Sequence, residues 1–445
     1  MMKGKAVSPP APRQPEPEKM DGGSSRMLRG DPMTGDRYWS TEWMDKEWEH
    51  MWKRVWHIGG RVADMPGAGD YVVHNFRHES VLLVRQTDGS FRAFFNVCQH
   101  RGNRLVWNES GGVPAFTCAY HGWRYRLDGS LDHAQNPENF SGGDPCKHVK
   151  LVQVPCDTWG GFVWFSMDQG ARPLLQFLHP IPTLLKNRDM ESMVRTVWRR
   201  VSVDTNWKFA CDNFNESYHL PAVHPMMGVY VDEDYRSHDF EIYANGHNRV
   251  VEPGRPSARL EANNSYWDGL LKSWDIDPSV YAGKPNEARL ALQRAKRTLG
   301  PGRGMTYMNK LTDEELTDFF HHTCFPNVTI TGSPVEGTVH IFRTEPHITD
   351  PGKCTFEYMA LNPRIEGATE TLTVSGMRPF EEAQPEVLTY GIDNVGDFID
   401  EDLSVAVQQQ RGLRSMGYQD AKLSEQEARV RRFHEVLNDY IEGRR

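Results

Sequence analysis

The sequence predicts a small all-β domain followed by a larger α+β domain. Between residues 57 and 165, short apolar runs alternate with turn signals such as the Asp-Gly-Ser sequences at 88–90 and 128–130, which is typical of short strands joined by tight turns. Beyond Pro173, helical and strand-like patterns are mixed, as in an α+β domain. Aromatic residues make up 11% of the chain, enough to fill packed cores.

The domain boundaries follow from where these patterns change. The first segment is rich in Pro, Gly, Ser and charge and lacks the apolar stretch of a signal peptide, so we expect a disordered tail. Next, Trp48, Met51, Trp52 and Val55 recur at helical spacing, which predicts an amphipathic helix that packs on the second domain. The predicted units are a tail (1–39), a helix (40–56), a β domain (57–170) and an α+β domain (171–445).

Several elements of the second domain can be predicted individually. Apolar runs with β-branched and aromatic residues predict strands at 327–332, 339–346 and 355–363. Ser or Thr followed three residues later by Glu, at 312–315 and 424–427, is a capping box that predicts the start of a helix.

Composition excludes several classes of function. The net charge is -9 and no long basic run occurs, so a nucleic-acid partner is not expected. No apolar stretch is long enough to span a bilayer. Seven cysteines in a chain of 445 residues do not resemble a disulfide framework. These features together predict a cytoplasmic protein.

The first candidate site is formed by two short motifs in the β domain, Cys98-Gln-His100 and Cys118-Ala-Tyr-His121. Two thiolates and two imidazoles match a Rieske [2Fe–2S] centre, in which two Cys hold one iron and two His hold the other. Tetrahedral zinc is the alternative for a set of two Cys and two His. The order Cys, His, Cys, His and the short first spacing are unlike those of common zinc fingers, so the pattern favours the iron–sulfur cluster.

A second candidate site lies in the α+β domain, where His219 and His224 are five residues apart. On an uninterrupted helix they would point roughly 140° apart. Pro221 is expected to break the helix, and a turn after His219 would allow both imidazoles to reach one metal. Two His and one carboxylate form the facial triad of mononuclear Fe(II) oxygenases. Four acids in a later helical run could supply the carboxylate: Asp397, Asp400, Glu401 and Asp402.

These stretches resemble one known family. NVCQHRGNRL (96–105) and CAYHGWRYRLDGSL (118–131) strongly resemble the Rieske domain of bacterial ring-hydroxylating oxygenases. NWKFACDNFNESYHLPAVHP (206–225) closely resembles the iron-binding segment of the same family. The resemblance implies an all-β Rieske iron–sulfur domain and an α+β catalytic domain of the helix-grip (START-like) type.

The resemblance also assigns residues. It implies that Cys98, His100, Cys118 and His121 hold the cluster, and that His219 and His224 bind the mononuclear Fe(II). The family has an aromatic residue four positions before its carboxylate ligand and a Gln-rich stretch after it. Here Phe398 and Gln410 therefore indicate Asp402 as the ligand, with Asp400 as the alternative.

Two further positions near the iron match the family pattern. Asn213 matches a residue close to the iron, and Glu216 matches a carboxylate that bridges the Rieske and mononuclear centres of adjacent subunits. Most ring-dihydroxylating members have Asp at the bridging position. Glu216 instead resembles oxygenases that act on quaternary ammonium compounds such as carnitine.

The resemblance implies the terminal component of an oxygenase that activates O₂ to hydroxylate or dealkylate a small organic substrate. Electrons would come from NAD(P)H through a separate flavin/iron–sulfur reductase, directly or through a ferredoxin. The implied assembly is a homotrimer in which His100 of one subunit meets Glu216 of the next. Three alternatives remain: an aromatic-ring cis-dihydroxylating dioxygenase of hydrocarbon catabolism, a Rieske electron carrier without oxygenase activity, and a ligand-binding protein with a vestigial iron site.

The substrate is not determined by these motifs. A cationic substrate would need an aromatic cage or an acid in its pocket, whereas an aromatic acid would need an arginine such as Arg249 or Arg343. The charged segment 252–310 lacks clear periodicity, and we expect an irregular insertion near the entrance to the site.

Overall fold

The computed structural model describes residues 19–20, 28–260, 264–332, 337–373 and 376–445. Much of the predicted tail (1–39) lies outside these residues. Its described part is not a free tail: Lys19–Met20 (β1) pairs with a strand of the main sheet, and Tyr38 is buried, with its hydroxyl donating to Asp212 at 2.6 Å. The tail expected up to residue 39 therefore gives way to packed structure before that residue.

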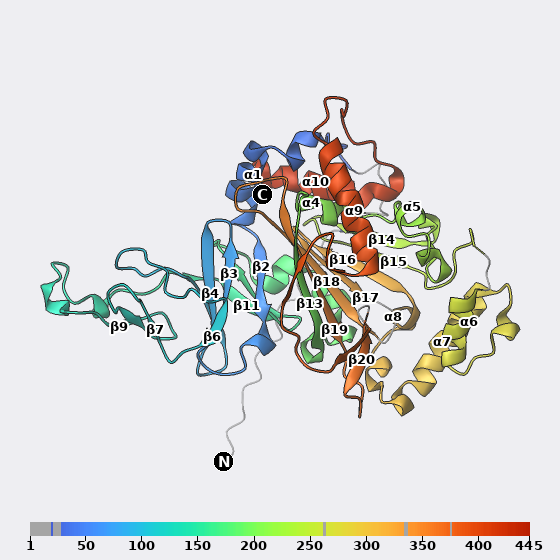
Figure 1. Cartoon of the computed structure of the whole chain (residues 1–445), viewed down its shortest axis with the longest axis horizontal. Helices are drawn as coiled ribbons and strands as arrows, with labels where there is room; N and C mark the ends of the chain where they lie inside the picture. Colours follow the sequence, from blue (N-terminus) through green and yellow to red (C-terminus); the bar gives the residue numbers. More distant parts are fainter. Residues whose placement is uncertain (1–18, 21–27, 261–263, 333–336, 374–375) are drawn as a thin grey trace, which may run out of the picture.

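The β domain consists of short antiparallel strands, as the turn-rich sequence predicts. In the described part of the chain they form a five-stranded sheet (order β10-β5-β4-β3-β6) and two three-stranded sheets (β11-β12-β2 and β7-β8-β9). The β7-β8-β9 sheet lies at the end of the molecule farthest from the α+β domain (Figure 1). The strands are β2 (Trp56–Arg61), β3 (Asp70–Phe76), β4 (Glu79–Arg85), β5 (Phe91–Phe95), β6 (Ser110–Gly112), β7 (Phe116–Thr117), β8 (Arg124–Tyr125), β9 (Leu131–His133), β10 (Gln153–Val154), β11 (Cys156–Trp159) and β12 (Phe162–Ser166).

The α+β domain is built on one large sheet. Among the described residues its order is β1-β14-β15-β16-β17-β18-β19-β13-β22, antiparallel except where β22 joins β13. The strands are β13 (Val194–Val203), β14 (Asp239–Tyr243), β15 (Asn248–Glu252), β16 (Phe319–Cys324), β17 (Val328–Gly332), β18 (Val339–Pro346), β19 (Cys354–Asn362) and β22 (Glu386–Thr389), with a separate hairpin of β20 (Glu370–Thr373) and β21 (Gly376–Pro379). Strands β17, β18 and β19 confirm the three strands predicted from the sequence.

Helices lie against this sheet and beyond its edge (Figure 1). They are α1 (Thr41–Glu47), α2 (Leu174–Leu178), α3 (Ile181–Leu184), α4 (Lys208–Phe214), α5 (Leu220–Val223), α6 (Ser265–Ser273), α7 (Pro285–Leu299), α8 (Asp313–Thr317), α9 (Asp397–Gly412) and α10 (Ala428–Ile441). Both predicted capping boxes are formed, at Thr312/Glu315 before α8 and at Ser424/Glu427 before α10. None of the helices in the described residues is long and apolar enough to cross a bilayer.

The prediction of an irregular segment at 252–310 is wrong. Helices α6 and α7 lie within it and pack through their own core, which includes Trp267, Leu271 and Leu292. The many charged residues hide the helical spacing of these apolar positions, because the charges occupy the solvent-facing side of each helix. In Figure 1 the two helices lie at the far edge of the α+β domain.

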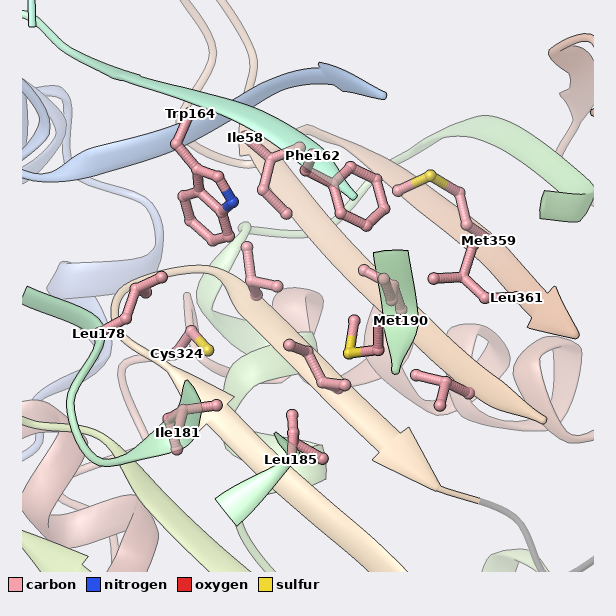
Figure 2. Close-up of a cluster of buried hydrophobic side chains, with 14 of the residues drawn as sticks. Ile58, Phe162, Trp164, Leu178, Ile181, Leu185, Met190, Cys324, Met359 and Leu361 are labelled. Carbon is pink, nitrogen blue, oxygen red and sulfur yellow. The ribbon is translucent and has the colours of Figure 1, made fainter. Parts of the chain in front are cut away.

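The two domains share a continuous apolar core. Ile58 and Phe162, from the β-domain strands β2 and β12, belong to one buried cluster with Ile341, Met359 and Leu361 of the large sheet. Figure 2 shows these β-domain side chains meeting those of the sheet. Because this interface is apolar and tightly buried, the β domain is held in one orientation relative to the large sheet.

The N-terminal helix is anchored in the α+β domain by a buried ion pair. Glu47 accepts from Lys208 Nζ at 2.6 Å and from Trp207 Nε1 at 2.9 Å, and both charged side chains are almost fully buried. Burial lowers the pKa of Lys208, and the charge of Glu47 acts against that shift. The following turn, Trp48–Trp52, is π-helical.

We expect Glu47→Gln to lower the free energy of unfolding by about 3 kcal/mol, because it leaves the Lys208 ammonium buried without a counter-charge. Urea denaturation followed by tryptophan fluorescence measures this change. The matched control is Glu49→Gln, which removes an exposed partner of Lys53 and should cost no more than about 0.5 kcal/mol. Equal effects of the two substitutions would contradict the expected role of the buried pair.

Candidate metal centres and active site

The two Cys/His motifs fold into loops of the same design at the tip of the β domain. In each, the N–H of a glycine four residues after the cysteine donates to the cysteine carbonyl: Gly102 to Cys98 and Gly122 to Cys118, both at 3.0 Å. The two glycines have φ of +77° and +69°, which side-chain-bearing residues rarely adopt. The tight turns thus present each cysteine and the histidine that follows it in the same way.

The four candidate ligands lie together. Cys98 and Cys118 are buried, and the rings of His100 and His121 are 4.6 Å apart between centroids. The His100 ring stacks on Trp123 at 4.7 Å, and its Nδ1 is buried without a hydrogen-bond partner among the described residues. A buried imidazole nitrogen with a free lone pair suits a metal ligand. The residues therefore fit a Rieske cluster.

The second site is built around the short connection between α4 and α5. Helix α4 ends at Phe214, earlier than the sequence suggested, and His219 is the N-cap of α5 while His224 is its C-cap. The expectation that Pro221 breaks a helix after His219 is wrong. Pro221 lies in the first turn of α5, where a missing N–H donor costs little. The single turn of α5 places both imidazoles on one side.

The structure brings His219, His224 and Asp402 together. One ligand atom from each residue lies within 4.8 Å of the others. Asp402 Oδ1 is 2.8 Å from His224 Nε2 and 3.7 Å from His219 Nε2. Asn213 Nδ2 donates to the same Oδ1 at 3.1 Å. Two imidazoles and one carboxylate converging from one side leave room for other ligands on the opposite side, which fits the donor set of a mononuclear Fe(II).

In addition to Asp402, each histidine has a carboxylate beside its Nδ1, the ring nitrogen that faces away from the metal position. Glu216 Oε1 lies 2.7 Å from His219 Nδ1, and Glu401 Oε2 lies 2.5 Å from His224 Nδ1. Burial alone would lower the pKa of both imidazoles, but these carboxylates and Asp402 outweigh it, so both pKa values are raised. With a carboxylate at Nδ1, each neutral ring keeps its proton there and directs the Nε2 lone pair toward the metal position.

Glu401, one of the four candidate acids, has a role that the sequence motifs do not indicate, because it lies beside His224 Nδ1. The sequence feature that points to this role is the position of Glu401 next to Asp402. Neighbouring residues of a helix point about 100° apart, so the two side chains can reach two sides of one imidazole. The other two acids of this run bond to groups outside the histidine pair. Asp400 accepts from the N–H of Val395 and Asp397 accepts from Asn394, so Asp402 is the member that lies beside both histidines.

Glu401→Gln is expected to weaken Fe(II) binding by about 10- to 100-fold, because an amide holds the imidazole tautomer less firmly than a carboxylate. Anaerobic Fe(II) titration measures the affinity, and the visible spectrum of the cluster monitors folding. Asp400→Asn is the control, since it removes a neighbouring charge that does not contact His224. An unchanged affinity in Glu401→Gln would refute this role.

A cavity of about 480 Å³ adjoins the three converging side chains. Its described lining includes the carboxylates Glu216, Glu252, Asp397 and Asp402 but no Lys or Arg. Neither arginine suggested for an aromatic acid lies there. Arg249 pairs with Asp239 and Glu241, and Arg343 pairs with Glu345 and Glu357.

Aromatic rings form two walls of this cavity. On one, Tyr230 is 5.0 Å from Tyr266 and 5.7 Å from Phe319 between ring centroids. On the other, Phe342 is 4.5 Å from Phe214 and 5.2 Å from Tyr358. Tyr266 comes from α6, so the segment expected near the entrance to the site does contribute to the cavity wall.

The structure thus joins a β domain whose loops fit a [2Fe–2S] cluster to an α+β domain whose converging side chains fit one iron. Residues 55–154 match the family model of the Rieske [2Fe-2S] domain, and residues 190–443 match that of the ring hydroxylating alpha subunit (catalytic domain). The chain belongs to the family of Rieske non-haem iron ring-hydroxylating oxygenase alpha subunits, and it is an oxidoreductase.

Individual relatives show which branches of the family the chain resembles. It is 33% identical to the carnitine monooxygenase oxygenase subunit of Escherichia coli over 62% of this chain and 73% of the relative. It is 27% identical to the large oxygenase component of the naphthalene 1,2-dioxygenase system of Pseudomonas putida, over 64% of this chain and 62% of the relative. The structure of the quaternary ammonium Rieske monooxygenase CntA with L-carnitine superposes with a TM-score of 0.63 at 19% identity, over 91% of this chain and 94% of that one.

Proposed function

We propose that this oxygenase hydroxylates or N-dealkylates a small alkylated amine, with electrons supplied by a separate reductase. The observation that carries the proposal is the cavity beside His219, His224 and Asp402. Its lining combines aromatic rings with carboxylates and, in the described residues, contains no Lys or Arg. Such a lining favours a positively charged or neutral substrate over an organic anion. The similarity to a carnitine monooxygenase and the Glu at position 216 support the same class.

The proposed division of work follows the two sites. Cys98, Cys118, His100 and His121 would hold the [2Fe–2S] cluster, and His219, His224 and Asp402 would hold Fe(II). When bound, the iron supplies O₂ binding and activation. Asn213 would hold the Asp402 carboxylate in place through its 3.1 Å hydrogen bond, and the aromatic walls would exclude water and orient the substrate.

The proposed reaction balances as a monooxygenation. One C–H bond, O₂, two electrons and two protons yield one C–OH group and one water. If the hydroxylated carbon is bonded to nitrogen, the C–N bond then breaks. Its electron pair stays with the amine, the hydroxyl proton is released, and the carbon becomes an aldehyde. The two electrons derive from NAD(P)H through the proposed reductase.

Electron transfer is proposed to occur between neighbouring copies in a homotrimer. Glu216, bound to His219, would accept from a cluster histidine of the next subunit, with His100 as the expected partner. Exposed apolar side chains support such a contact at both ends: Trp107 and Tyr120 near the cluster loops, and Tyr218 and Met226 near the iron site.

Two further parts of the proposal concern fold type and location. The antiparallel sheet with the long helices α9 and α10 packed beside it supports assignment to the helix-grip (START-like) type. None of the seven cysteines, all of which lie in the described residues, forms a disulfide, which supports a cytoplasmic location.

Aromatic-ring cis-dihydroxylation is the second candidate. The many rings in the cavity and the similarity to the naphthalene 1,2-dioxygenase component favour it. It would require two oxygen atoms in one product molecule, so labelling with ¹⁸O₂ separates it from amine monooxygenation. An electron carrier without oxygenase activity would have no use for the convergence of His219, His224 and Asp402.

The test of the proposed function is iron content and product analysis of anaerobically purified protein. We expect about three irons per chain, two in a cluster with a Rieske EPR signal and one mononuclear. With a reductase and O₂, alkylated amines should yield hydroxylated or dealkylated products that contain one labelled oxygen atom. Two irons per chain, not increased by added Fe(II), would favour the electron carrier, and zinc without a Rieske spectrum would exclude both.

Glu216→Ala is expected to slow oxidation of the reduced cluster during a single turnover by about 10-fold or more, because it removes the proposed bridge while leaving the cluster ligands intact. Glu216→Asp, which retains a carboxylate, should restore part of the rate. Stopped-flow absorbance of the cluster measures both. A rate unchanged in Glu216→Ala would argue against the bridge.

A further inference from the structure

Glu252 is a buried carboxylate that borders the substrate cavity. It lies at the end of β15, is 1% exposed and belongs to the cavity lining. The hydroxyl of Ser217, two residues before His219, donates to it. Glu252 is thus joined to the loop that carries an iron-site histidine.

Glu252 has no lysine or arginine partner in the described structure. Its nearest basic atoms are His321 Nε2 at 3.6 Å and His238 Nδ1 at 3.8 Å, both longer than a strong hydrogen bond. The buried guanidinium of Arg429 donates instead to the carbonyl of Phe214 and to Asn248. Burial lowers the pKa of Arg429, and the charges of Glu252 and Glu216 act against that shift, so Arg429 interacts with Glu252 through space without bonding to it.

The carboxylate nevertheless remains ionised. Burial alone would raise the pKa of Glu252, but the charges of His321 and His238 and the Ser217 hydrogen bond lower it to about 2. The protein therefore stabilises a negative charge at the edge of the cavity. A cationic group bound in the cavity would be attracted to this charge.

The cavity also provides rings for a cation. The wall formed by Tyr230, Tyr266 and Phe319 presents three neighbouring rings, and the faces of such rings attract an ammonium group. An alkylated ammonium is suited to this setting because its methyl groups pack on the rings while its charge interacts with both the rings and a carboxylate.

A substrate carboxylate would find no comparable partner. The described lining of the cavity has no Lys or Arg. Carboxylates in binding sites are usually held by arginine or lysine. Here a second negative charge would instead face Glu216, Glu252 and Asp397.

We propose that the cavity selects substrates with a single positive charge, using Glu252 as the counter-ion and Tyr230, Tyr266 and Phe319 as the surface that holds the ammonium, and that it disfavours zwitterions. This inference rests on the proposed function, since it names the class of amine used at the same site. It also distinguishes the chain from its carnitine-oxidising relative, because carnitine carries a carboxylate as well as its ammonium group.

The experiment compares three ligands on the reduced, anaerobic holoenzyme by isothermal titration calorimetry. Choline is the cation, dimethylbutanol has a quaternary carbon in place of the choline nitrogen, and carnitine is the zwitterion. We expect choline to bind at least about 10-fold more tightly than either of the others. Glu252→Gln should weaken choline by about 10-fold and leave dimethylbutanol within about twofold.

Two sets of variants separate recognition from folding. Asp239→Asn on the neighbouring strand removes an exposed carboxylate paired with Arg249 and should leave all three affinities unchanged. Tyr266→Leu removes a ring from the partly exposed face of α6 and should weaken choline selectively, whereas Tyr266→Phe should not. These tyrosine variants test the inference even if Glu252→Gln does not fold, which its visible spectrum and iron content would reveal.

The outcomes distinguish this inference from the function on which it rests. Carnitine binding as tightly as choline, or dimethylbutanol matching choline, would overturn the selectivity while leaving amine oxidation intact. If no amine binds and aromatic hydrocarbons are dihydroxylated instead, the proposed function itself fails. Selective loss of choline binding in both Glu252→Gln and Tyr266→Leu would support the inference.

Discussion

The candidate iron site depends on two hydrogen bonds, from His219 to Glu216 and from His224 to Glu401. Each fixes the orientation of an imidazole whose other nitrogen points toward Asp402. The two carboxylates come from different parts of the fold, one from the loop between α4 and α5 and one from α9. The site therefore exists only where α9 packs against that loop, and the large sheet beneath them determines where this occurs.

The sequence predicts the ligands of one candidate metal centre more completely than those of the other. Cys98, His100, Cys118 and His121 lie in two short motifs, so their number, order and spacing reveal a cluster before any fold is known. His219 and His224 are also close in sequence. Their carboxylate partner is about 180 residues away, and it was chosen among four acids only by family resemblance. Which acid faces the histidines depends on the rotation of α9, a property of packing.

The wrong expectations share a physical origin. The segment 252–310 looked irregular because abundant surface charge masks the apolar positions of α6 and α7. Pro221 looked like a helix breaker because the sequence does not reveal that α5 starts just before it, where proline is tolerated. The sequence does not distinguish Glu252 from a surface residue, because a glutamate in a charged stretch is ordinarily solvated. Only the packing of β15 under the cavity makes it a buried anion.

Because Tyr266 comes from α6, part of the cavity wall and the candidate metal site lie on different stretches of the chain. The candidate iron ligands and the proposed bridging carboxylate lie at the ends of α5, on α9 and in the α4–α5 loop, whereas this part of the cavity wall belongs to a helical segment with its own core. Exchange of that segment during evolution could alter which molecules are accepted without disturbing the path of electrons. Diversification of substrate range and preservation of redox chemistry would then be inherited through different stretches of the same chain.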